Sequence, residues 1–185
     1  MVNEILLKRK SIKTFLPGNI DDEKIEALFK AASMAPSSMN EQPWSFIIAK
    51  KEDEDNFNKL LNLMSQKNQI WAKDSSILVV AIAKRNFSLN NKVNKHYIYD
   101  VSSAVANLTY QALSIGLYVH QVGGFDVERS RKELNISDQY DPVVMLSIGY
   151  NAGDDNIINT KPRKNLKEFV FEKQFGNPAN FRSEV

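Results

Sequence analysis

Ala35-Pro36-Ser37-Ser38-Met39-Asn40-Glu41-Gln42-Pro43-Trp44 is a polar turn between a predicted helix and a predicted strand. Its hydroxyl and amide side chains both donate and accept hydrogen bonds, which suits a flat heteroaromatic ring with alternating N–H, C=O and N edges. The alternative is that Pro36 to Ser38 only end the helix and Pro43 begins an edge strand. The residues alone leave both interpretations open.

The segments around this turn predict alternating helices and strands. Before it, Asp21 or Asp22 caps a helix with apolar residues at helical spacing, and after it we expect a strand at Ser45 to Ala49. Ser76 to Ala83 is apolar on both faces, which is typical of a central strand covered by helices. A long helix is expected to start at Asp100 and to end at Gly116, followed by strands at Leu117 to Gln121 and Val143 to Tyr150.

Composition favours one compact domain over residues 1–185. The chain has 185 residues, 43% of them hydrophobic, which is enough for one substantial core. No apolar run reaches the length of a membrane span and no export signal is recognised, so we expect a cytoplasmic protein without membrane contact. The absence of cysteine excludes disulfides, thiolate metal sites and cysteine nucleophiles, and two histidines give no metal-ligand spacing.

Cations are concentrated near the two ends of the chain. Lys8, Arg9, Lys10 and Lys13 lie near the start, and Lys161, Arg163, Lys164 and Lys167 lie near the end. If the clusters meet in the fold, they make a pocket for a doubly charged phosphate; otherwise each is a solvated surface run. In an extended segment Arg9, Ser11 and Lys13 share one face, while Ile12 packs the other way.

Two further segments are candidates for ligand contact. Gly123-Gly124 leads into a helix capped by Asp126, and paired glycines let backbone N–H groups approach a ligand, although many turns use them. Asn68-Gln69-Ile70-Trp71 supplies two amides and an aromatic ring. The polar segment from Lys84 to Lys95 is expected to be a mobile surface loop. The aromatic residues of the tail, about 171–185, must cover either this domain or a partner subunit.

Taken together, four segments resemble the FMN-dependent nitroreductase family in order and spacing. They are Arg9-Lys10-Ser11-Ile12-Lys13-Thr14-Phe15, Ala35 to Trp44, Gly123-Gly124-Phe125 and Lys161-Pro162-Arg163. The resemblance implies an α+β fold with a central, mainly antiparallel sheet wrapped by helices. It also implies an intertwined homodimer with an FMN in each of two interfacial sites.

The resemblance assigns the contacts of the cofactor to particular residues. Arg9, Lys10 and Ser11 would hold the phosphate and ribityl chain, joined by Lys161 and Arg163. Gly123 and Gly124 would approach the N5 and O4 edge of the ring, and Asn68, or Gln69 in its place, would contact the pyrimidine edge. The partner subunit would contribute Pro36, Ser37, Ser38 and Asn40.

The implied chemistry is carried by the flavin, with no catalytic side chain. NADH or NADPH would reduce FMN at N5, leave, and be replaced by a nitroaromatic, quinone or similar small-molecule acceptor. Lys13 has a role that follows from electrostatics, because a cation near N1 and O2 stabilises the negative charge of reduced flavin. Lys10 stands where relatives often have Arg or His, which keeps the charge but loses the planar fork.

Two rival functions remain at this point. One is a non-redox flavin-binding or flavin-using relative, since one fold hosts unrelated chemistry. The other is a binder of nucleic acid or another anionic surface through the basic clusters, although the net charge of +2 argues against it.

Overall fold

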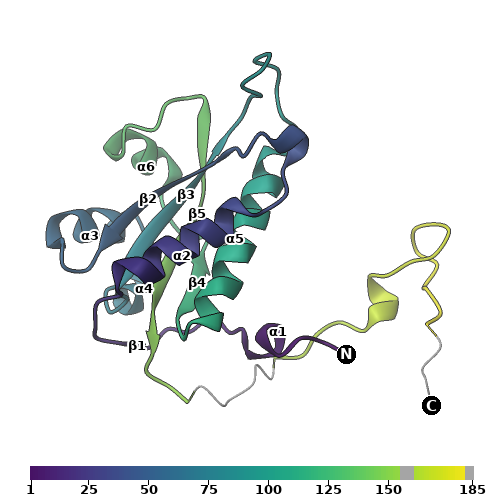
Figure 1. Cartoon of the computed structure of the whole chain (residues 1–185), viewed down its shortest axis with the longest axis horizontal. Helices are drawn as coiled ribbons and strands as arrows, with labels where there is room; N and C mark the ends of the chain where they lie inside the picture. Colours follow the sequence, from purple (N-terminus) through teal and green to yellow (C-terminus); the bar gives the residue numbers. More distant parts are fainter. Residues whose placement is uncertain (155–160, 182–185) are drawn as a thin grey trace.

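The chain folds around a five-stranded antiparallel sheet (Figure 1). The structure is a computed structural model and describes residues 1–154 and 161–181. The strands are β1 (Phe15–Leu16), β2 (Trp44–Lys50), β3 (Ile77–Lys84), β4 (Tyr118–Val122) and β5 (Tyr140–Asn151). The order is β1-β5-β3-β2, with β4 also paired to β5, and each of these pairs is antiparallel. The mainly antiparallel sheet is thereby confirmed.

The predicted central strand is β3, which pairs with β2 on one side and β5 on the other. Successive residues of a strand point to opposite faces. Accordingly Ile77, Val79 and Ala81 belong to one buried cluster, whereas Leu78 and Val80 belong to another. Both faces are therefore covered, which explains why this strand is apolar throughout.

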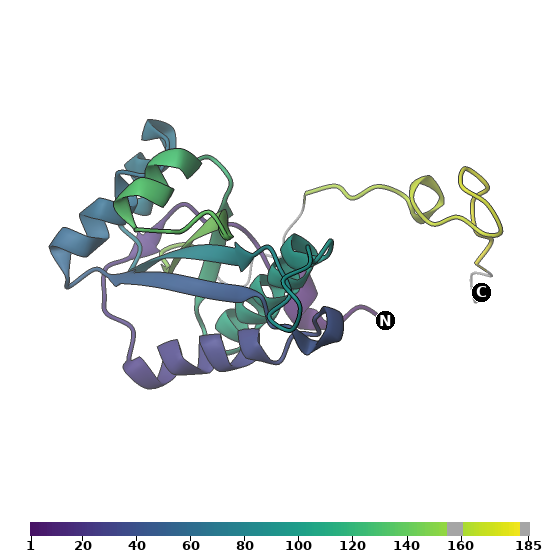
Figure 2. The ribbon, with the colours of Figure 1, turned by 90° about the horizontal axis from the view of Figure 1, so that it is seen from above.

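Helices α2 (Asp22–Ser33) and α5 (Tyr97–Ser114) pack together on one face of the sheet (Figure 2). The cap of α2 is Asp21, one of the two predicted residues. Helix α5 begins at Tyr97, earlier than the predicted start at Asp100, and Asp100 is buried. The predicted start was wrong because Asp100 lies in the first turn of the helix, where its carboxylate hydrogen-bonds to another segment.

The opposite face is covered by α3 (Glu54–Leu61) and α4 (Gln66–Ala72), and α6 (Val127–Glu133) lies on the same side (Figure 2). Asn68 to Trp71 therefore lie on a short helix. Helix α1 (Glu4–Lys8) packs against α5. Among residues 1–154 and 161–181, no helix combines the length and the apolar character that crossing a bilayer requires.

The segment between β3 and α5, which was expected to be a mobile loop, makes hydrogen bonds to other parts of the chain. Asn94 is fully buried and its N–H donates to the carbonyl of Arg85 at 2.8 Å. The Ser88 N–H and hydroxyl both donate to Glu41, at 2.9 and 2.6 Å. These contacts between segments distant in sequence hold the loop, and its polar composition gave no sign of them.

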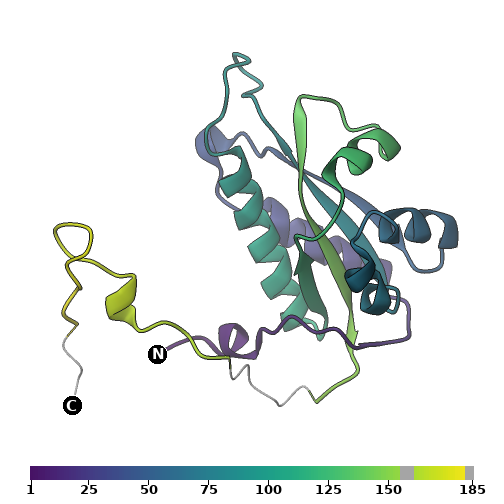
Figure 3. The same ribbon diagram turned by 180° about the vertical axis from the view of Figure 1, so that it is seen from behind.

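The described part of the tail lies away from the sheet, beyond α1 (Figures 1 and 3). It contains the 3-10 turn η2 (Leu166–Glu168), and its Phe175 side chain is 92% exposed. The aromatic rings of Phe171 and Phe175 contact each other edge to face, with ring centroids 4.9 Å apart. Residues 155–160, which include Thr160, lie outside the described residues. So do the last residues of the tail, 182–185.

Candidate functional site

The basic segment of residues 9–13 has the alternation expected of an extended chain. Ile12 is buried, whereas Ser11 and Lys13 are exposed. Arg9 Nη1 donates to Ser11 Oγ at 3.3 Å, and Lys10 Nζ donates to the carbonyl of Asp154 at 2.7 Å. The exposed face of this segment therefore presents cations and a hydroxyl together.

His120 on β4 holds this segment through a hydrogen bond to its backbone. Its Nδ1 lies 2.7 Å from the carbonyl oxygen of Ile12, and because a carbonyl only accepts, Nδ1 carries the proton. The imidazole stacks on Trp71, with ring centroids 4.3 Å apart. Burial lowers the pKa of His120, the bond to Ile12 opposes that shift, and the neighbouring cations lower it further. The imidazole is therefore held neutral, and Ile12 is held against β4.

The cations that act on His120 come from both ends of the chain. Lys13 and Arg9 belong to the N-terminal segment, and Lys161 belongs to the C-terminal one. All three lie close enough to lower the pKa of the imidazole by charge repulsion. The N-terminal segment and Lys161 are therefore both within electrostatic range of His120 on β4, and Arg163, two residues after Lys161 in the sequence, is exposed.

The paired glycines follow directly at the end of β4. The carbonyl oxygen of Gly124 accepts from the Ser65 N–H at 2.9 Å and from Asn68 Nδ2 at 3.2 Å. A Cβ at Gly124 would lie 2.8 Å from Asn68 Nδ2, whereas one at Gly123 would meet nothing within 4 Å. The amide of Gln69 donates to the Met64 carbonyl at 2.8 Å. Asn68 is therefore the amide that lies beside the glycines, and Gln69 is engaged elsewhere.

The turn that carries Pro36, Ser37, Ser38 and Asn40 lies elsewhere in the chain. It contains η1 (Ser38–Asn40) and sits beside the N-terminal end of α5, where the Ser38 N–H donates to Asp100 Oδ2 at 3.1 Å. A recess of about 300 Å³ is lined there by Pro36, Ser37, Ser38, His96, Tyr99 and Asp100. The turn is therefore beside an open recess but far from the basic segment.

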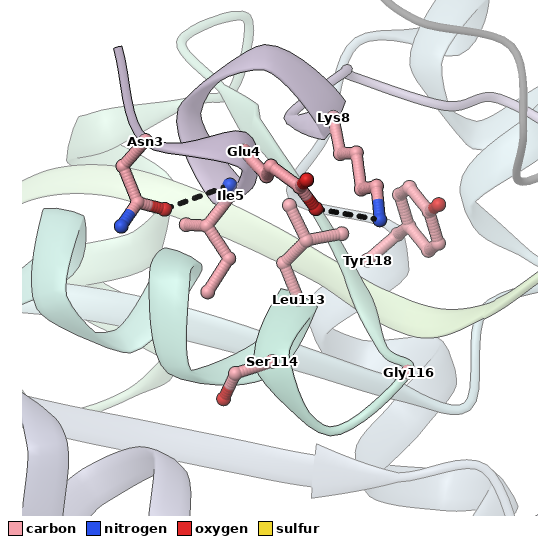
Figure 4. A pocket seen from close by; sticks show the side chains of 8 residues that line it. All are labelled: Asn3, Glu4, Ile5, Lys8, Leu113, Ser114, Gly116 and Tyr118. Carbon is pink, nitrogen blue, oxygen red and sulfur yellow. Dashed lines mark hydrogen bonds and ion pairs between the residues drawn. The ribbon is translucent and has the colours of Figure 1, made fainter. Parts of the chain in front are cut away.

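Helix α5 separates the two halves of the candidate site. Arg9 and Lys10 lie near Thr109 and Leu113, in the C-terminal half of this helix. From Asp100 to Leu113 the helix rises about 20 Å. A second recess, of about 620 Å³, lies between α1 and this end of α5 (Figure 4). Figure 4 shows Glu4 and Lys8 of α1 facing Leu113 and Tyr118 across it. One chain therefore does not bring the two halves to a single small ligand.

The donor set at β4 suits a cofactor with a phosphate and a polar ring. Cations from both chain ends match a phosphate, and the Ser11 hydroxyl matches a sugar-like chain. Asn68 offers an amide, and Gly123 and Gly124 offer exposed backbone, at the end of β4. The residues present therefore fit the group that the sequence suggested.

Three residues of this region were missed as site residues. His120 was considered only as a metal ligand, although its place on the strand before the glycine turn was a usable signal. Asp100 was expected only to start a helix, and Glu41 was part of the polar turn without a role. The latter two act through contacts across 62 and 47 residues of sequence, for which the chain carries no local signal.

Comparisons with known proteins agree on one family. The model of the nitroreductase family matches residues 6–150. A protein of Archaeoglobus fulgidus assigned as an NADH dehydrogenase/NAD(P)H nitroreductase is 26% identical, over 92% of this chain and 97% of its own. A solved structure described as an oxidoreductase containing FMN has a TM-score of 0.88 at 27% identity, over 96% of this chain and 94% of its own. Mouse iodotyrosine deiodinase 1 is 26% identical, over 90% of this chain and 67% of its own.

Proposed function

The chain belongs to the nitroreductase family, and from this premise we propose that it is an FMN-dependent oxidoreductase. It transfers a hydride from NADH or NADPH, through FMN, to a nitroaromatic, quinone or similar small-molecule acceptor. The observation that carries the proposal is that Arg9 and Lys13 and, from the other end of the chain, Lys161 all act electrostatically on His120. Like charges repel, and a bound phosphate would offset that repulsion.

Each step of the proposal has residues in this chain to perform it. Arg9, Lys10 and Ser11 bind the phosphate and ribityl chain, together with Lys161 and Arg163. Bound FMN supplies the hydride chemistry at N5, while Asn68, Gly123 and Gly124 orient the ring. Lys13 is exposed on the same face as Arg9, and its charge stabilises the negative charge that develops on reduction.

We further propose that the active form is an intertwined homodimer. The partner subunit contributes Pro36, Ser37, Ser38 and Asn40, because in one chain these residues lie at the other end of α5 from the basic segment. The tail of residues 171–185 covers the partner. Two observations support this role: Phe175 is exposed, and the described part of the tail lies away from the sheet of its own chain (Figure 3). A cytoplasmic location, without nucleic acid or membrane as partner, completes the proposal.

The absorption spectrum of the purified protein tests the cofactor. We expect a yellow protein with flavin bands, bleached anaerobically by NADH or NADPH and recoloured by a nitroaromatic or a quinone. Protein that stays colourless after FMN is added would contradict the proposal.

Reduction separates the proposed function from the non-redox alternative. A flavin-binding relative without redox activity binds FMN but is not bleached by either pyridine nucleotide. Steady oxidation of NADH or NADPH that depends on the added acceptor is the outcome that we expect.

A further inference from the structure

We propose that Asp100 is a positioning residue for the flavin site: its buried carboxylate holds the turn of residues 37–42 in the shape that meets FMN across the dimer. The inference rests on the proposed function, since that function assigns this turn to FMN. It adds a residue which, in this proposal, acts on the cofactor only through the turn.

The backbone of this turn is strained. Met39, Asn40 and Gln42 have φ values of 53°, 55° and 51°, in the left-handed region. Residues other than glycine disfavour this region of backbone conformation. Such a backbone persists only where surrounding contacts impose it. Three such residues within four positions require a strong external constraint.

Asp100 supplies that constraint. Asp100 is only 3% exposed, and its Oδ2 accepts a hydrogen bond from the backbone N–H of Ser38 at 3.1 Å. Within residues 1–154 and 161–181, Asp100 makes no ion pair, so its buried Oδ2 depends on hydrogen-bond donors. A buried acceptor that loses its donor costs free energy. Oδ2 therefore favours the turn geometry that keeps the Ser38 N–H in place.

Asn94 orients the carboxylate from the other side. This residue is fully buried, and its Nδ2 donates to the same Oδ2 of Asp100 at 3.3 Å. Its own Oδ1 accepts the His96 N–H at 2.9 Å, at the start of α5. The chain of contacts thus runs from the helix start through Asn94 and Asp100 to the turn.

A second carboxylate fixes the far side of the turn. Glu41 accepts from the N–H and hydroxyl of Ser88 and from Lys84 Nζ at 3.4 Å. Within the turn, Ser37 Oγ accepts the Gln42 N–H at 3.0 Å. Ser37 and Ser38 are thereby set before a ligand arrives, which reduces the ordering cost of binding.

Substitution of Asp100 separates positioning from general stability. The hydrogen bonds from the Ser38 N–H and from Asn94 Nδ2 both end on Oδ2 of Asp100. Asp100→Asn keeps them when its amide oxygen takes the position of Oδ2, whereas Asp100→Ala removes them. Asp53→Ala is the matched control, because Asp53 also accepts a backbone N–H at a helix start, from Asn56 at 3.3 Å, but at α3. Two quantities are measured: amide hydrogen exchange of residues 37–42 in flavin-free protein, and the FMN dissociation constant from the quenching of FMN fluorescence.

We expect Asp100→Ala to speed exchange at Ser38 and to weaken FMN binding, each by about tenfold. Asp100→Asn should stay within about threefold of the wild type in both, as should Asp53→Ala. Asn94→Ala, which removes one donor to the same oxygen, should change both quantities in the same direction by less, and it serves if Asp100→Ala does not fold.

Unchanged exchange at Ser38 in Asp100→Ala, or a lower melting temperature with unchanged FMN affinity, would overturn the inference. If the wild type itself fails to bind FMN, the proposed function falls. In that case the exchange measurement, which needs no flavin, still decides whether Asp100 holds the turn.

Discussion

Gly124 shows at the scale of one residue how closely the turn after β4 is packed against Asn68. Its carbonyl oxygen accepts two hydrogen bonds, from Ser65 and Asn68, and its Cα faces the Asn68 amide. The neighbouring Gly123 has open space at the same position. The packing therefore excludes a side chain at Gly124, whereas it leaves room for one at Gly123.

Gly124→Ala should destabilise the flavin-free protein by about 1 kcal/mol, because the added methyl group displaces the Asn68 side chain. Gly123→Ala is the matched control and should change the free energy of unfolding by less than about 0.5 kcal/mol. Urea unfolding of the two variants measures the difference. Equal stability of the two variants would mean that the Asn68 amide moves aside without cost.

At the scale of elements, Asp141 on β5 joins three parts of the chain. Its carboxylate accepts from Arg85 Nε and Nη2 at 2.7 and 2.5 Å and from the Tyr97 hydroxyl at 2.9 Å. It also pairs with Arg131 of α6. The loop after β3, the start of α5 and α6 are therefore anchored to the sheet at one carboxylate.

Asp141→Asn should lower the free energy of unfolding at pH 7 by about 2 kcal/mol, because two guanidinium groups lose their anion. Glu133→Gln is the control, since the Arg129–Glu133 pair is a more exposed helix pair that contributes less than about 0.5 kcal/mol. Urea titrations of both variants beside the wild type measure the two losses.

The same carboxylate makes stability depend on pH. The hydrogen bond from Arg85, then that from Tyr97, lowers the pKa of Asp141 below its ordinary value, against the opposing effect of burial. Its stabilisation is therefore complete above the pKa of the unfolded chain, about 3.9, and is lost as pH falls through the lower folded value. Wild type should lose stability more steeply than Asp141→Asn below about pH 4. Parallel pH profiles would exclude this contribution.

At the scale of the whole molecule, the two proposed half-sites lie at opposite ends of α5. The basic half lies by the C-terminal end of the helix and the hydroxyl and amide half by its N-terminal end. In the proposed homodimer, a second copy in the opposite direction would bring unlike halves together twice. The projecting tail is the segment that we propose to hold that copy (Figure 1).

Removal of residues 165–185 should therefore weaken the dimer and FMN binding together, each by about tenfold or more, since the exposed phenylalanine side chains that cover the partner in the proposed dimer are lost. Lys161 and Arg163 remain in this variant. Sedimentation at matched protein concentrations and FMN titration measure the two effects, and circular dichroism checks that the domain stays folded. A truncated protein that stays dimeric with unchanged FMN affinity would assign the tail another role.

The sequence by itself determined the elements and the chemistry of the basic segment. Apolar periodicity identified β3 and α2, and the alternation of Ile12 with Ser11 and Lys13 was confirmed, because local spacing fixes which face a side chain takes. The order of the four motifs identified the family. Bounds were less certain, as the early start of α5 shows.

Only the tertiary structure decided which distant groups meet. It brought Lys161 and Arg9 within electrostatic range of His120, put Asn68 rather than Gln69 next to Gly124, and joined Asp100 to the strained turn by a hydrogen bond. It also put the turn and the basic segment at opposite ends of one helix. Such pairings depend on how separate elements pack, and burial and hydrogen bonding across long loops leave no periodic trace in the chain.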